Sequence, residues 1–371
     1  MVSLFLAKLI LSTCAADSLS SSSLIVDEAP NEPRPYVLLR NTGLTVALGQ
    51  GILRYQVTGN ISEQSFAMIT QSAPQSSILA VLPHIHRQTY ENFFVQKGRV
   101  QMWAWQNETG GQEFSRVMTD GDYAVIPHDT LHTFQFLEPE TELTFIVQPG
   151  GFERLFFALS DSVFSTSTRA SFVPEENLNP PGAGNDPDIL SELEVYDVYF
   201  RPEYSPTHNG NNALAKDSSS AAFVAKDWSE KYLNTEEGCY QIIQPLATPV
   251  QTDGNMTMGT LILSPRFPNE TVPVYNLNAP TSLLVREGQL TLDIHQYESL
   301  TIHSGDSAFI PPNVSFSYYS KSAMTRVMYV SGGAAALDSV LLRDAIPWNY
   351  TTYPTYAGYG RIGHGNETLA R

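Results

Sequence analysis

Residues 84–98 read HIHRQTYENFFVQKG. His84 and His86 are two positions apart, and side chains at i and i+2 of a β-strand project from the same face. Glu91 follows five residues after His86, and an apolar run then leads to Gly98. The stretch therefore predicts two imidazoles on one face of a strand, with a carboxylate close behind them in the chain.

A fourth candidate ligand lies downstream. Gly121 is followed by Pro127, and His132 comes after the turn that Pro127 begins, in a segment that reads as another strand. Three imidazoles and one carboxylate suit a divalent first-row transition metal with coordination positions left open for a substrate. We therefore predict one mononuclear metal site formed by His84, His86, Glu91 and His132.

The surrounding sequence is typical of an all-β protein. Short runs rich in β-formers alternate with Gly, Pro, Asn or Asp, and long helical periodicity is absent. One short helix is expected at 152–159. In the N-terminal half, strands are expected at 36–39, 53–57, 66–70, 93–95, 100–105, 124–126 and 143–147. In the C-terminal half, they are expected at 240–243, 258–263, 282–285, 290–294, 307–310 and 326–330.

The two halves share the order of their turn-forming residues. Gly98, Gly121-Asp122 and Pro127 recur in the same order as Gly288, Gly305-Asp306 and Pro311, which indicates a duplicated domain. We predict two antiparallel β-barrels of the jelly-roll type with a few short helices. Their expected boundaries are an N-terminal barrel with the metal site at 17–164, a connection rich in Ser, Pro, Asn and Gly at 165–225, a C-terminal barrel at 226–347 and an irregular tail at 348–371.

The second barrel has lost its ligands. Counting from Gly288 and Gly305 by the offsets of the first half places Val274, Asn276, Thr281 and Phe316 at the four ligand positions. None is an imidazole or a carboxylate. We therefore expect a metal-free scaffold, with Phe316 and its neighbours filling the space.

The composition and the N-terminal sequence indicate which partners and which cellular compartment to expect. A formal charge of −17 and a pI near 4.8 repel phosphate groups, so nucleic acid and anionic membranes are not expected partners. Residues 1–16 resemble a secretory signal peptide, with Lys8, a short apolar run and small residues before the cleavage point. Secretion would also explain seven N-glycosylation sequons, at Asn60, Asn107, Asn255, Asn269, Asn313, Asn349 and Asn366.

The ligand spacing resembles that of the cupin family. A secreted chain of two cupins with one intact N-terminal site is similar to the bicupin family of fungal quercetin 2,3-dioxygenases, also called flavonol 2,4-dioxygenases. The similarity extends along nearly the whole mature chain. It includes the stretches 23–30, 34–37, 82–86, 90–93, 147–153 and 231–234.

The resemblance implies a copper enzyme that opens the central ring of a flavonol such as quercetin with O2 and releases carbon monoxide. Glu91 would be both a ligand and the base that takes the proton of the flavonol 3-hydroxyl, whose pKa the cation lowers. Phe93 and Phe134 match aromatic positions of the family pocket. From the donor set alone, manganese, iron, cobalt and nickel stay open beside copper.

The chain departs from the family in the substrate pocket. Leu53 stands where the family has a tyrosine, and Ile69 and Gln71 replace a methionine and a threonine, so a related phenolic substrate stays open. Another cupin oxidoreductase or a decarboxylase acting on a small acid is a second hypothesis, and a non-enzymatic binding or storage cupin is a third. Cupin sheet edges often pair, so a homodimer is one expected state of assembly.

Overall fold

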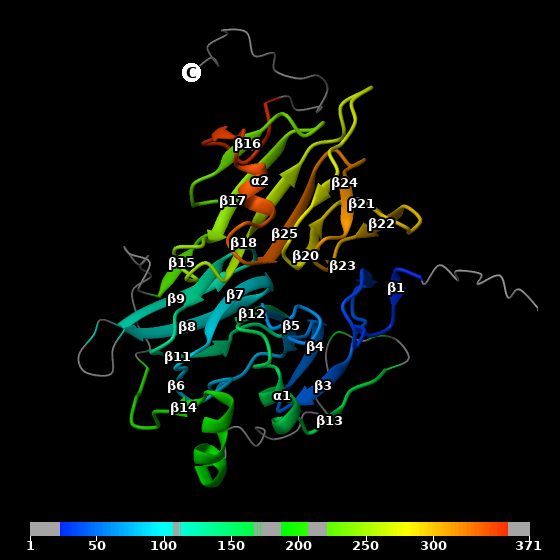
Figure 1. The fold of residues 1–371 in the computed structure, drawn as a ribbon. Coiled ribbons are helices and arrows are strands. Elements are labelled where there is room, and N and C mark those ends of the chain that lie inside the picture. Colours follow the sequence, from blue (N-terminus) through cyan, green and yellow to red (C-terminus); the bar gives the residue numbers. More distant parts are fainter. Residues whose placement is uncertain are drawn as a thin grey trace, which may run out of the picture.

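The structure is a computed structural model that describes residues 23–106, 111, 113–166, 169, 171, 187–206 and 221–354. The expected signal peptide at 1–16 and the sequons at Asn107 and Asn366 lie outside this part of the chain. Two β-rich halves follow one another, the first coloured mainly blue to green and the second yellow-green to red in Figure 1. In the described ranges, no helix is both long and apolar enough to cross a membrane.

The N-terminal barrel is built from two sheets. One sheet has eight strands in the order β13-β3-β4-β5-β12-β7-β10-β15, and the other has five in the order β14-β6-β11-β8-β9. Its elements are β3 (Thr45–Leu48), β4 (Gly51–Val57), β5 (Ala67–Ala73), β6 (His84–Ile85), β7 (Tyr90–Lys97), β8 (Arg99–Gln106), β9 (Glu113–Thr119), β10 (Tyr123–Ile126), β11 (Thr130–Phe136), β12 (Thr141–Gln148), α1 (Arg154–Leu159), β13 (Ser162–Val163), the 3₁₀ helix η3 (Pro187–Tyr196), β14 (Tyr199–Phe200) and β15 (Ala222–Val224).

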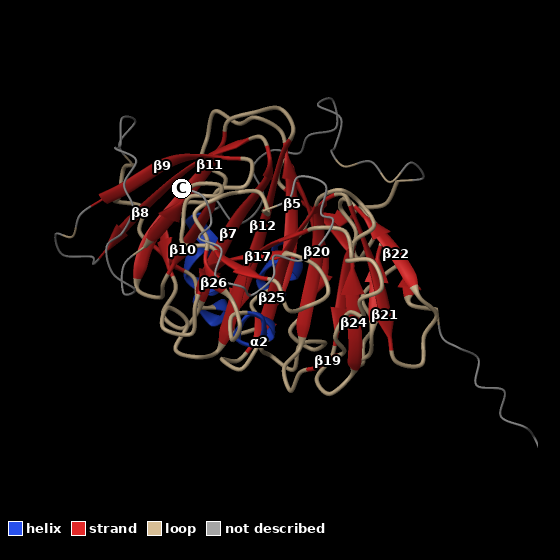
Figure 2. Ribbon diagram, turned by 90° about the horizontal axis from the view of Figure 1, so that it is seen from above, coloured by secondary structure: helices blue, strands red, loops and turns tan. Residues whose placement is uncertain are grey.

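The C-terminal barrel repeats this plan with a nine-stranded sheet, ordered β1-β2-β23-β20-β25-β18-β17-β16-β26, and a four-stranded sheet, ordered β19-β24-β21-β22. Helices are few and short in both halves (Figure 2). The elements are β1 (Ile25–Val26), β2 (Tyr36–Leu38), β16 (Tyr232–Asn234), β17 (Gln241–Ala247), β18 (Met256–Leu263), β19 (Tyr275–Asn276), β20 (Thr281–Glu287), β21 (Gln289–Ile294), β22 (Leu300–His303), β23 (Ser307–Ile310), β24 (Ser315–Tyr319), β25 (Thr325–Gly332), α2 (Leu337–Leu341) and β26 (Ile346–Pro347). The predicted all-β bicupin architecture is confirmed.

Strands near the middle of the large sheets are buried on both faces. Strand β7 shows why: Phe93 packs in the apolar core of the N-terminal barrel, whereas Phe94 packs in a second core shared by the two halves. Tyr36, Met256 and Phe309 belong to that shared core as well. Because both faces are covered, such strands read as continuous apolar runs instead of alternating ones.

The two halves exchange edge strands. Strand β2 precedes the N-terminal barrel in sequence but pairs with β23 of the C-terminal sheet, and β15 pairs with β10 of the N-terminal sheet. The duplicated Gly-Asp pair holds each exchanged strand at its end. Asp122 Oδ1 accepts a hydrogen bond from the backbone N–H of Lys226 at 2.8 Å, and Asp306 Oδ1 accepts one from that of Arg40 at 2.8 Å.

These pairings correct the predicted boundaries. Residues 25–38, placed in the N-terminal barrel by sequence, add two strands to the C-terminal sheet. The segment 165–225, expected as a plain connection, supplies β14, β15 and η3 to the N-terminal half. Residues 348–354 form no helix or strand, yet Trp348 and Tyr353 are buried in a small apolar cluster of the C-terminal half. The physical reason in each case is burial of an otherwise open sheet edge or apolar face.

Candidate metal centre and its cavity

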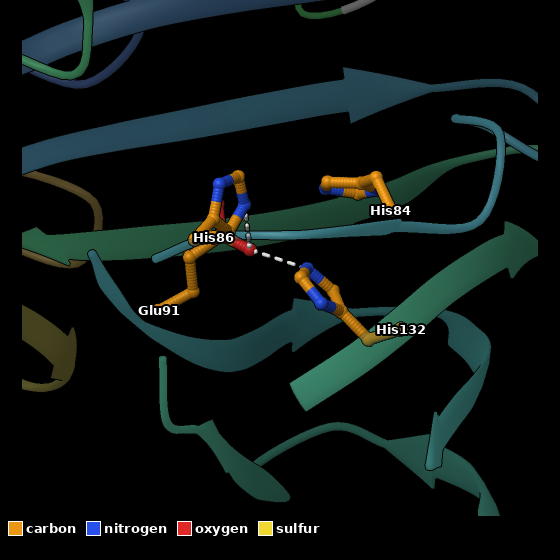
Figure 3. A group of neighbouring side chains, drawn as sticks. All are labelled: His84, His86, Glu91 and His132. Atoms are coloured by element: carbon orange, nitrogen blue, oxygen red, sulfur yellow. Dashed lines mark hydrogen bonds and ion pairs between the residues drawn. The ribbon is translucent and has the colours of Figure 1, made fainter. Parts of the chain in front are cut away.

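Four side chains from both sheets of the N-terminal barrel converge in its interior (Figure 3). His84 on β6 and His132 on β11 stand directly opposite one another across a strand pair. His86 follows two residues after His84, and Glu91 comes from β7 of the other sheet. Their ligand atoms all lie within 4.8 Å of one another, and all four residues are buried. The predicted ligand residues are thus brought together by the fold.

The three imidazoles are held in one tautomer. The Nδ1 atom of His84 is 2.8 Å from the carbonyl oxygen of Leu82, and that of His132 is 3.0 Å from the carbonyl oxygen of Thr130. For His86, the partner is the carbonyl oxygen of Asp197 at 2.7 Å. A carbonyl oxygen only accepts hydrogen bonds, so each Nδ1 carries the proton and each Nε2 is left as the metal ligand.

The fourth donor, Glu91, lies at the point where the imidazoles meet. Its Oε2 atom is 2.8 Å from Nε2 of His132 and 3.5 Å from Nε2 of His86. Burial alone would raise the pKa of Glu91, but electrostatic attraction to His86 and His132 outweighs it and holds that pKa well below its ordinary value. The carboxylate is therefore ionised throughout the neutral range.

The pKa values of His84 and His86 are shifted in opposite directions. Burial lowers the pKa of His84 well below its ordinary value, and the neighbouring imidazoles lower it further. For His86, burial is opposed by the charge of Glu91, which raises the pKa. Nε2 of His86 is buried without a hydrogen-bond partner. An orphaned buried nitrogen beside an ionised carboxylate fits a bound cation, and three nitrogens with one oxygen suit a first-row transition metal.

A cavity of about 130 Å³ opens beside these ligands, and His84 and Glu91 face it. Its walls are mainly apolar. Leu53, Gln71, Phe93 and Phe134 line the cavity as predicted. Ile69 does not, although its position was predicted to do so; it is fully buried in the barrel core, and its cross-strand partner Phe145 lines the cavity instead.

Several lining residues were missed by sequence reasoning. Helix α1 contributes Leu155, Phe156 and Leu159, and the segment after it contributes Leu193, Val198 and Phe200. The helix itself was predicted at 152–159, and it is observed at Arg154–Leu159. The signal for the second group is weak, since the apolar pattern around 193–200 is short and follows a loose, polar stretch. Asp197, which holds His86, was missed for the same reason.

Gln71 brings an amide group into this apolar cavity. Its side chain lies over Gly51 on the neighbouring strand, where a Cβ atom would come within 2.5 Å of the Gln71 Nε2 atom. The absence of a side chain at Gly51 therefore makes room for the amide. Besides the metal ligands, the polar side chains that line the cavity in the described residues are Gln50, Gln71 and Ser76.

The corresponding place in the C-terminal barrel requires one correction. Strand pairing sets Tyr275 opposite Phe316, as His84 is opposite His132, so Tyr275 and Leu277 occupy the inward positions. Both are buried, whereas Val274 and Asn276 are exposed. The count from Gly288 was wrong by one residue because Tyr275 precedes Thr281 by six positions, whereas His84 precedes Glu91 by seven. Phe316 packs against the rings of Tyr275 and Tyr318, as expected for a filled interior.

The sequon asparagines in the described part of the chain share one property. All five are exposed, at Asn60, Asn255, Asn269, Asn313 and Asn349. Each is therefore accessible to a glycosylating enzyme on the folded protein.

Comparison with known proteins agrees with the site. No protein-family model matches the chain. Quercetin 2,3-dioxygenase of Aspergillus japonicus is 36% identical over 351 residues, covering 90% of this chain and 99% of that protein. Quercetin 2,3-dioxygenase of Bacillus subtilis is 22% identical over 312 residues, covering 83% and 85% of the two chains. A solved structure of oxalate decarboxylase from Bacillus subtilis has a TM-score of 0.47 at 12% identity, over 83% of this chain and 78% of that one. With a relative this similar over nearly its full length, the chain belongs to the quercetin 2,3-dioxygenase family.

Proposed function

We propose that this protein is a secreted, copper-dependent dioxygenase that opens the central ring of flavonols such as quercetin with O2. One observation carries the proposal most directly. A buried donor set of three histidines and one ionised glutamate opens into an apolar, aromatic-lined cavity, and Glu91 faces that cavity. Such a site suits a flat phenolic substrate whose hydroxyl oxygen can bind the metal.

The residues of the chain have separate tasks in the reaction. The metal, when bound, acts as a Lewis acid that lowers the pKa of the flavonol 3-hydroxyl and brings the substrate and O2 together. Glu91 accepts the hydroxyl proton, since its carboxylate is ionised and faces the cavity. Phe93, Phe134 and Phe145 hold the flat ring system and exclude water. Both oxygen atoms enter the ring-opened product, and one ring carbon leaves as carbon monoxide.

We also propose that the metal is copper and that the protein is extracellular. A nitrogen-rich donor set binds copper more tightly than manganese, iron, cobalt or nickel, which supports copper. The signal-like segment 1–16 and the exposed sequons support secretion. A homodimer formed through a sheet edge remains our expectation for the state of assembly.

A cupin that acts on a small acid would need a cationic anchor in the cavity. Arg87 is instead paired with Asp129 at 2.7 Å, and Lys97 is paired with Glu140. Among the described residues that line the cavity, none is a lysine or an arginine. The walls therefore favour a flat, weakly polar substrate over a compact carboxylate.

The function is tested by incubating purified, copper-loaded protein with quercetin under air and measuring carbon monoxide together with the loss of flavonol absorbance. We expect turnover with about one metal per chain by elemental analysis, and loss of both metal and turnover in His84→Ala and His132→Ala. Glu91→Gln is expected to retain some metal but lose at least about 100-fold in kcat, the scale of general base catalysis. Activity on oxalate with none on any flavonol would refute the proposal.

A further inference from the structure

The three histidine ligands differ in what holds their rings. His84 and His132 each donate from Nδ1 to a carbonyl oxygen two residues earlier in their own segment, at Leu82 and Thr130. His86 donates to the carbonyl oxygen of Asp197, 111 residues away in the sequence. Two ligands are therefore oriented locally, whereas the third depends on a distant segment of the chain.

Asp197 also binds the turn that follows His86 through its side chain. Its Oδ1 atom accepts a hydrogen bond from the backbone N–H of Arg87 at 2.9 Å. Its Oδ2 atom accepts three more, from the backbone N–H of Gln88 at 2.8 Å and from the N–H and Oγ1–H of Thr89, each at 2.9 Å. Through its carbonyl and its carboxylate, this one residue holds the imidazole and the backbone that carries it.

The segment around Asp197 is fastened to the barrel on both sides. Tyr199 and Phe200 pair with Ile85 and His84 as a short antiparallel strand, and the N–H of Arg201 donates to the carbonyl oxygen of Pro83 at 2.7 Å. On the N-terminal side, Leu193 of η3 is buried in an apolar cluster with Leu155 of α1 and Val147 of β12. Asp197 has a φ of 66°, a left-handed conformation that aspartate tolerates better than most residues.

We propose that Asp197 is a positioning residue that sets the orientation of His86 and thereby the affinity and geometry of the metal centre. The inference rests on the proposed metal site. The same segment provides Leu193, Val198 and Phe200 to the cavity wall. It therefore connects the substrate-facing wall to one of the metal ligands.

The test compares Asp197→Asn and Asp197→Ala with a matched control, Asp227→Asn. Asp227 also has a left-handed φ, of 60°. Its carbonyl oxygen accepts a hydrogen bond from Lys231, and its carboxylate accepts two from Arg326, in the C-terminal half. Copper(II) affinity is measured by competition with a chelator, and the geometry of the bound ion by electron paramagnetic resonance. Thermal unfolding of the metal-stripped proteins reports on the fold.

We expect Asp197→Ala to weaken copper binding by about tenfold to a hundredfold and to change the resonance spectrum, the range typical of residues that orient metal-bound histidines. Both variants keep the backbone carbonyl, but Asp197→Asn also keeps one side-chain acceptor oxygen, so its copper affinity should fall between those of Asp197→Ala and the wild type. Asp227→Asn should lower thermal stability without changing the copper affinity or the spectrum.

Other results would contradict either the role of Asp197 or the metal centre itself. Wild-type affinity and spectrum in both Asp197 variants would overturn the inference, while the metal centre would stand. An equal loss of affinity in Asp227→Asn would also overturn it, because the effect would then be a general loss of stability. Failure of the wild type itself to bind copper would instead refute the metal centre on which the inference rests. Should Asp197→Ala fail to fold, the affinity and spectrum of Asp197→Asn decide.

Discussion

At the scale of single residues, the metal ligands were predictable and their supports were not. His84, His86 and Glu91 are close in sequence, and their spacing has a meaning on strands that any β-protein shares. Asp197 holds His86 through its backbone carbonyl, and a carbonyl oxygen has no signature in a sequence. Phe200 is likewise placed by pairing with His84, not by a pattern of its own.

Gln71 should select among flavonols. Its amide can hydrogen bond a ring hydroxyl, a contact worth about 1 kcal/mol or roughly fivefold in kcat/KM. We expect Gln71→Leu to lower kcat/KM for quercetin by about this factor and to leave that for unsubstituted 3-hydroxyflavone nearly unchanged. Steady-state kinetics with both substrates measure the ratio. Equal losses for both would mean that Gln71 shapes the cavity without hydrogen bonding the substrate.

At the scale of elements, each copy of the Gly-Asp pair binds an exchanged strand. Gly305 has a φ of +93°, and a Cβ atom there would lie 2.5 Å from the Arg40 side chain, while at Gly121 it would lie 2.6 Å from Lys226. The glycine lets an exchanged strand pass closely, and the next aspartate accepts its backbone N–H. The repeat was visible in the sequence, but its partners were not, because Arg40 and Asp306 are 266 residues apart.

Gly305→Ala is expected to destabilise the protein more than Gly333→Ala. Both glycines have positive φ, but Gly333 has no atom within 4 Å of the added Cβ position. Backbone strain alone costs about 1 to 2 kcal/mol, and the collision with Arg40 adds about 1 to 3 kcal/mol at Gly305.

Denaturant-induced unfolding of the two variants and the wild type gives the comparison. Equal destabilisation would show that Arg40 moves aside freely and that Gly305 is needed only for its backbone conformation.

Element prediction found most of the long strands and failed for strands of two residues, although the seven-residue β9 was missed as well. The apolar run at 93–95 was enough to find β7, although pairing extends it to Tyr90–Lys97. Strands β6, β14 and β19 have two residues each. Strands β6 and β19 are defined by pairing with the longer strands β11 and β24, and β14 by pairing with β6. The one-residue error at Tyr275 arose at such a strand, where spacing alone does not define which residue faces inward.

At the scale of the whole molecule, charges as well as apolar side chains join the halves. A polar cleft of about 390 Å³ lies between them, lined among others by Asp120, Lys226 and Arg286. Asp120 is 2.6 Å from Arg286 and 2.8 Å from Lys226. Burial alone would raise the pKa of Asp120, but the hydrogen bond from Lys226 and the charge of Arg286 outweigh it and hold the pKa below its ordinary value of 3.8.

The contribution of Asp120 to stability should therefore depend on pH. A carboxylate with a depressed pKa in the folded state stabilises the protein fully above pH 3.8 and loses this effect as the pH falls below it. The side chain is 47% exposed, so we expect at most about 1 kcal/mol.

Thermal unfolding of Asp120→Asn and the wild type between pH 3 and pH 7 provides the measurement. Plots of melting temperature against pH for the two proteins should be parallel above about pH 5 and approach one another below pH 4. A difference that stays constant down to pH 3 would contradict the ion pair as its cause.

The exchanged strands impose an order on biosynthesis. Arg40 leaves the ribosome early, but Asp306 follows 266 residues later, which is roughly 13 to 53 seconds at ordinary translation rates. During that interval the residues of β2, all buried in the finished protein, have no sheet to join. A nascent chain halted before β23 would therefore display an apolar strand whose edge toward β23 is unpaired, and chaperones that bind such edges should associate with it until the second barrel is complete.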